Sequence, residues 1–74
     1  MSMTGYNALA IAIIEQAVKD FRAAQRKLRK DPYNIIARRT ARETEAFFCS
    51  NWFKVLTSVN GPAILKQLKE EFNV

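Results

Sequence analysis

The chain of 74 residues contains one cysteine and no histidine. A single cysteine cannot form an internal disulfide, and without histidine the usual zinc-binding ligand sets are missing. Histidine is also the commonest acid–base catalyst near neutral pH, and the seven carboxylates are scattered along the chain. We therefore expect a protein that is not an enzyme, with no metal site and no cofactor.

Glycine and proline are also scarce, at two residues each. Neither glycine belongs to a phosphate-binding loop pattern, which argues against nucleotide hydrolysis. The apolar run of residues 8–14 is too short for a signal peptide or a membrane span. We therefore expect a cytoplasmic protein with no membrane partner, and in that reducing environment we expect Cys49 to be a buried thiol.

Hydrophobic residues make up 49% of the chain, as in a folded domain. The length predicts one helical domain, residues 1–74, in which residues 1–6 form an N-terminal tail. A single core of this size provides roughly 3–5 kcal/mol of stability unless a partner subunit adds to it. Self-association into a homo-oligomer would supply that addition.

The spacing of apolar residues predicts an all-α fold. A long helix from Asn7 to about Lys30 and a second helix from about Tyr33 to Cys49 form an antiparallel hairpin, separated by Asp31 and Pro32. A short third helix, Asn51–Leu56, and a packed C-terminal helix complete a small bundle. The predicted N-caps are Thr4 or Asn7 for the first helix, Ser50 for the third, and Asn60 or Gly61 for the last, which has Pro62 in its first turn.

One apolar stripe on each long helix predicts the core. These positions are Ile14, Ala17, Phe21, Ala24 and Leu28 in the first helix, then Tyr33, Ala37, Ala41, Thr44 and Phe48 in the second, widened by Ile36 and Phe47. In the last helix they are Ile64, Leu65, Leu68 and Phe72. The aromatic group of Phe47, Phe48, Trp52 and Phe53 is predicted to be core rather than a base-stacking platform.

Positive charge is concentrated on the hairpin, where residues 19–42 hold nine Lys and Arg against two Asp. Helical spacing predicts a basic stripe of Lys19, Arg22, Arg26 and Lys30, extended by Arg38, Arg39 and Arg42. Such a stripe is typical either of a solvated surface or of a site for an acidic partner. That partner would be nucleic acid, an acidic protein surface or a phosphorylated small ligand.

The first turns of the long helix are apolar around most of their circumference, with Leu9, Ile11, Ile13 and Ile14 interleaved with alanines. One buried face cannot hold all of them. We expect this segment to be an oligomer or partner interface, the alternative being that the last helix folds back and covers it.

Three segments carry a resemblance to a known family: EQAVKDFRAAQRKLRKDPYN, FFCSNWFKVLT and NGPAILKQL. Together they resemble a family of small phage and prophage proteins with an EQAVxDY-like first helix, an FFxSxWFxxLT block and a DG before the final helix. Asn60 here replaces the acidic residue of that DG, and Phe21 stands where tyrosine is common. The resemblance implies a phage origin and a small helical fold, with no established activity.

From these features we expect a noncatalytic phage-type accessory protein that binds stoichiometrically and inhibits a host protein or an anti-phage defence component. One alternative is a nucleic-acid-binding protein that uses the basic hairpin on phosphates. A third hypothesis is a sponge for a phosphorylated signal molecule, with the same arginines as phosphate ligands.

Overall fold

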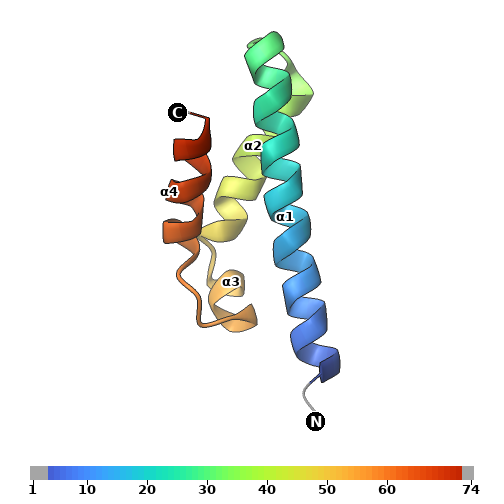
Figure 1. Ribbon diagram of the computed structural model, residues 1–74, viewed down its shortest axis with the longest axis vertical. Helices are drawn as coiled ribbons and strands as arrows, with labels where there is room; N and C mark the ends of the chain where they lie inside the picture. The colour runs from blue at the N-terminus through green and yellow to red at the C-terminus, as the bar shows by residue number, and fades with distance from the viewer. Residues whose placement is uncertain (1–3, 73–74) are drawn as a thin grey trace.

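The computed structural model of the protein describes the backbone of residues 4–72 and the side chains of residues 8–72. This part of the chain forms four helices and no strand: α1 (Thr4–Lys30), α2 (Ile35–Phe48), α3 (Asn51–Leu56) and α4 (Gly61–Glu71). Figure 1 shows α1 and α2 as an antiparallel hairpin, with α4 beside it and α3 next to the N-terminal half of α1. The predicted all-α bundle is confirmed.

The long helix starts earlier than predicted, because α1 begins at Thr4 and so includes part of the expected tail. Residues 1–3 of that tail lie outside the described residues, as do the side chains of the two predicted caps, Thr4 and Asn7. Asn7 is inside the helix rather than at its N-terminus. The basic last turn of α1, with Lys27, Arg29 and Lys30, lies at the negative end of the helix dipole as predicted.

The three shorter helices, α2, α3 and α4, are each capped at the N-terminus by a side chain. Ser50 accepts a hydrogen bond from the amide of Phe53 at 3.2 Å, and Asn60 accepts one from Ala63 at 3.1 Å, which confirms both predicted caps. The α2 cap is Asn34, whose side chain accepts a hydrogen bond from an α2 backbone amide at 2.9 Å. Because Asn34 is extended, α2 begins two residues later than predicted.

The core lies where α1, α2, α3 and α4 meet, and it combines small residues with three fully buried rings: Phe21, Phe48 and Phe53. Alanines on both hairpin helices let the two backbones approach closely. The buried set is Ala17, Phe21, Ala24, Ala37, Ala41, Phe48, Phe53, Leu65 and Leu68, with Ile14, Leu28, Phe47 and Ile64 packed at its edge. Most of the predicted core positions are therefore confirmed.

Four predicted core residues are wrong, because Tyr33, Ile36 and Trp52 are 81%, 71% and 55% exposed and Cys49 is also exposed. Tyr33 lies in the turn before α2, beyond the packed part of the hairpin. Ile36 and Cys49 each sit one residue from a buried position, about 100° around the helix from the core face. Trp52 is in the first turn of α3, beside the ring of Phe47 and outside the buried cluster.

The molecule is elongated, with extents of 45 × 19 × 19 Å and a radius of gyration of 13.4 Å, against about 11 Å for a compact chain of this length. The 27 residues of α1 span about 40 Å, whereas the 14 residues of α2 span about 21 Å. The N-terminal part of α1 therefore projects past α2 (Figure 1). Within the described residues, no helix is both long and apolar enough to cross a membrane.

Candidate functional site

The predicted basic stripe divides into separate surfaces in the folded chain. Lys19, Arg26 and Lys30 are exposed and follow one another along the side of α1 that faces away from α2. Arg22 lies between that side and α4, where it is bound to a carboxylate. The three predicted arginines of α2 lie on a different helix face, so the seven residues do not form one continuous stripe.

Arg22 holds the end of α4 against α1. Its Nε donates a hydrogen bond to Oε1 of Glu71 at 3.1 Å, and its Nη2 donates one to Oε2 at 2.9 Å. The hydrogen bond from Arg22 lowers the pKa of Glu71 against a partial desolvation that raises it, and the charges of Arg22 and Arg26 add to the lowering. The same bond raises the pKa of Arg22. Arg29 lies nearby, 5.3 Å from the ring centre of Phe72.

A second basic surface is formed by Arg38, Arg39 and Arg42 of α2. Together with Ile35 they line a surface hollow of about 330 Å³, which we call the arginine hollow. No carboxylate lines it. None of the three forms an ion pair within the part of the chain whose side chains are described. Three unpaired guanidinium groups around one hollow could bind phosphate or carboxylate oxygens.

The predicted apolar interface also divides into two faces. Leu9 and Ile13 lie four residues apart and therefore share one side of α1. Ile11 and Ile14 line a hollow of about 210 Å³ against Leu56 of α3. Leu9 and Ile11 remain 59% and 55% exposed, because α4 packs beside the C-terminal half of α1. The alternative that the last helix covers this segment is therefore wrong.

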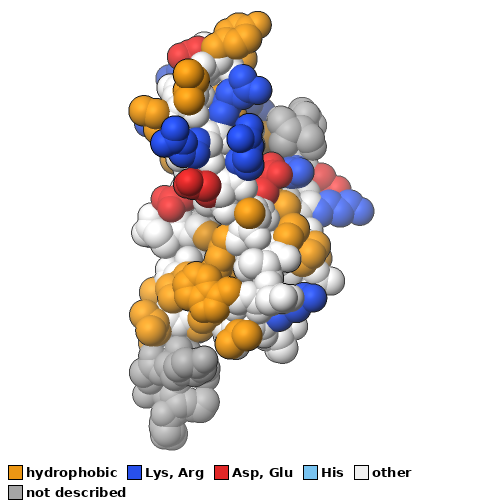
Figure 2. All heavy atoms as spheres, turned by 180° about the vertical axis from the view of Figure 1, so that it is seen from behind, with side chains coloured by type: hydrophobic (Ala, Val, Ile, Leu, Met, Phe, Trp, Pro, Cys, Tyr) orange, Lys and Arg blue, Asp and Glu red, His pale blue; other side chains and the backbone are white. Residues whose placement is uncertain are grey.

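The side of the hairpin opposite α4 carries a groove of about 350 Å³, which we call the open groove. Its lining comes from three helices: Ile13, Gln16, Ala17 and Asp20 of α1, Glu43, Thr44 and Phe47 of α2, and Trp52 of α3. Trp52 meets the ring of Phe47 edge-on, with centroids 5.6 Å apart and planes at 72°. Figure 2 shows this side of the molecule, with apolar side chains gathered below acidic ones and basic side chains above both.

The open groove has an acidic rim on an otherwise basic hairpin. Asp20 accepts a hydrogen bond from the Nε2 of Gln16 at 2.8 Å. Neither Asp20 nor Glu43 forms an ion pair within the described residues, where both ion pairs instead join α4 to the hairpin. Thr44 donates its hydroxyl to the carbonyls of Thr40 and Ala41, so the hydrogen of this hydroxyl is already used within α2. A smaller hollow of about 110 Å³ continues beyond Asp20 and ends at Lys27 and Ile36.

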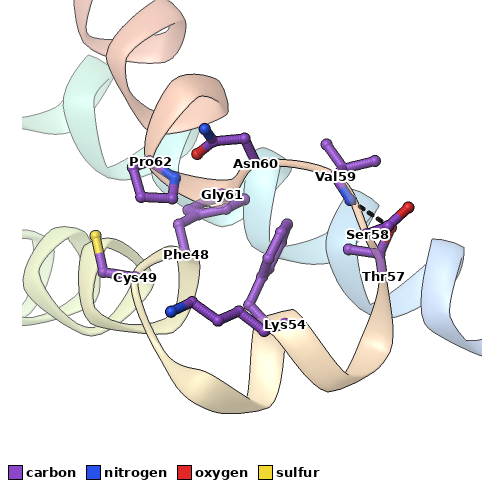
Figure 3. A pocket seen from close by; sticks show the side chains of 10 residues that line it. Phe48, Cys49, Lys54, Thr57, Ser58, Val59, Asn60, Gly61 and Pro62 are labelled. Carbon is purple, nitrogen blue, oxygen red and sulfur yellow. Dashed lines mark hydrogen bonds between the residues drawn. The ribbon is translucent and has the colours of Figure 1, made fainter.

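Another hollow, of about 390 Å³, lies under the N-terminus of α4 (Figure 3). It is formed by the segment between α3 and α4 and the end of α2, including Cys49, Lys54, Asn60 and Pro62. Lys54 is the only charged residue in its lining. Among the described residues, no three metal-binding side chains gather here or elsewhere. We therefore base the candidate site on the open groove and the arginine hollow.

The sequence pattern does not reveal the open groove, because it predicts Trp52 in the core. A helical projection could have found its rim, because Asp20 is three residues from Ala17 and Glu43 is four residues from Phe47, so each carboxylate shares a helix side with a lining residue. Antiparallel pairing of the two helices then brings both carboxylates to the same side. The chain matches no protein-family model, and neither curated proteins nor solved structures gave a match.

Proposed function

We propose that the chain is a noncatalytic, phage-type accessory protein that works by stoichiometric binding to another protein, with inhibition of a host or defence component as the outcome. The phage origin rests on the sequence resemblance described above. The main support for protein binding is exposed apolar surface. Among residues 8–72, eight large hydrophobic side chains are more than half exposed: Leu9, Ile11, Tyr33, Ile35, Ile36, Trp52, Val55 and Val59.

The shape of the molecule supports the same proposal. Its extents are 45 × 19 × 19 Å, so much of each helix lies at the surface. An elongated shape with exposed apolar side chains is typical of a subunit that buries more surface on association. A second copy and a different protein are both partners of this kind.

Capture and reconstitution test the proposal. The tagged chain is used to isolate proteins from bacterial extract, and the isolated protein is then purified and titrated against the chain. We expect a complex with a fixed ratio of subunits, measured by light scattering, and loss of the partner's activity at that ratio. Turnover of a substrate by the chain alone, abolished by one substitution, would contradict the proposal.

Self-association is tested separately at the apolar start of α1. If this segment joins copies of the chain, Ile11→Asp lowers the mass measured by light scattering, because a buried carboxylate would lose hydration without gaining a partner. Glu15→Gln, on an exposed position one turn later, is the matched control and leaves the mass unchanged. An unchanged mass for Ile11→Asp would remove this segment from any interface between copies.

The arginine hollow supports a second candidate function, binding of nucleic acid or of a phosphorylated small ligand by Arg38, Arg39 and Arg42. Titration of labelled single- and double-stranded DNA at several salt concentrations tests the first. If the arginines bind phosphates, the logarithm of the affinity should fall linearly with the logarithm of the salt concentration. Thermal unfolding with added nucleotides tests the second, since a ligand at a hundredfold excess over its Kd adds about 2.7 kcal/mol. No change in either measurement would leave the arginines as a solvated surface.

A further inference from the structure

We infer that the open groove is a docking site for a basic amphipathic helix of a partner protein. The helix would place apolar side chains against Ile13, Phe47 and Trp52, and a Lys or Arg against Asp20 and Glu43. This inference rests on the protein-binding function proposed above and assigns it a surface and a class of partner.

The opposite side of the hairpin shows how such a helix is held. There α4 buries Leu65 and Leu68 against the hairpin, while Lys69 reaches Glu45 of α2 at 3.6 Å. On α4, the apolar residue Leu65 is thus followed one turn later by Lys69. Leu65 packs on apolar side chains of the hairpin, and Lys69 pairs with a carboxylate beside them. The open groove offers the same combination with no occupant from the described residues.

The charge of the groove selects the partner. Asp20 and Glu43 face one groove from two helices, whereas residues 19–42 as a whole are strongly basic. Carboxylates without ion pairs beside an apolar floor favour a cationic helix and disfavour an acidic one. A second copy is disfavoured, because two-fold pairing centred on these residues would bring each carboxylate against its own copy.

Trp52 reports directly on occupancy, because it is the single tryptophan of the chain, is 55% exposed and lines the groove. Its emission moves to shorter wavelength when a bound helix excludes water. The probe is a synthetic amphipathic peptide of about four helical turns, with leucines on one face and lysines elsewhere. The matched probe has the same leucines with glutamates in place of the lysines.

We expect the lysine peptide to shift the emission of Trp52 in a saturable way and the glutamate peptide to bind at least about tenfold more weakly. Glu43→Lys should weaken the lysine peptide by about tenfold, and Asp20→Lys with Glu43→Lys should reverse the preference between peptides. Glu70→Lys, an exposed carboxylate on α4, is the matched control and leaves both affinities unchanged. Circular dichroism verifies that every variant stays helical.

Three outcomes of the fluorescence titrations would overturn the inference: equal affinity for the two peptides, no shift with either, or the same shift on raising the concentration of the chain alone. The last would assign the groove to a second copy. A captured partner that binds wild type and Glu43→Lys equally would also overturn the groove assignment, while the protein-binding function would stand.

Discussion

Arg22 of α1 and Glu71 of α4 are 49 residues apart in the sequence and are joined by two hydrogen bonds, the shorter of 2.9 Å. Their side chains are 41% and 45% exposed, so the pair lies at the surface. This ion pair holds the C-terminal end of α4 against α1. Because Arg22 is already paired with Glu71, it is less available to bind an acidic partner.

The pair predicts a pH dependence of stability. The folded state lowers the pKa of Glu71, so the contribution of this carboxylate to stability is present above the unfolded value of 4.5 and is lost as pH falls through the folded value. Glu71→Gln should therefore melt slightly below wild type at pH 7, and the difference should shrink toward pH 3. Glu70→Gln is the matched control, on an adjacent exposed carboxylate, and should melt with wild type throughout. A constant difference across this range would show that Glu71 acts by packing rather than charge.

Removal of the central ring should unfold the protein. Phe21 is fully buried, so Phe21→Ala leaves a cavity and costs about 3–5 kcal/mol, close to the whole stability of a chain this small. Tyr33→Ala removes a ring that is 81% exposed and should change stability by less than about 0.5 kcal/mol. Urea unfolding followed by circular dichroism measures both. Equal losses would mean that Tyr33 packs in the core after all.

Gly61 is required by close approach of α4 to the end of α2. A Cβ atom at this position would overlap the carbonyl oxygen of Phe48 and lie 3.0 Å from a ring carbon of Phe53. Gly61→Ala should therefore lower the free energy of unfolding by about 1–3 kcal/mol through overpacking. Ala63→Ser, at an exposed position of the same helix, should stay within about 0.5 kcal/mol. A Gly61→Ala variant as stable as wild type would rule out this close approach.

Cys49 should react with a thiol reagent in the native protein, because it is exposed at the C-terminal end of α2. We expect one thiol per chain to be labelled without denaturant, and Cys49→Ser to change stability by less than about 0.5 kcal/mol. Labelling that occurs only in urea would support the original prediction of a buried thiol.

Much of the fold follows from local sequence. Apolar residues spaced alternately three and four positions apart form the buried stripe of α1, which includes Ala17, Phe21 and Ala24. Ser50 and Asn60 cap the helices that follow them. These features depend on residues within one or two turns of each other, so a single sequence contains them. The missed cap, Asn34, was available in the same way, since it stands two residues after Pro32.

Tertiary structure alone decided which apolar side chains are covered. The helix α2 has apolar residues on several sides, but α4 packs on one of them, so Phe48 is buried while Ile36 is not. Trp52 of α3 is likewise left exposed. The same choice placed Glu45 beside Lys69 and left Glu43 with Asp20 in the open groove. The spacing of apolar residues in the sequence indicates how apolar each face of a helix is. Which face is buried against another helix depends on packing between segments that are distant in the sequence. The sequence by itself therefore determined the helices and most of the core, and the packing of α4 decided the candidate site.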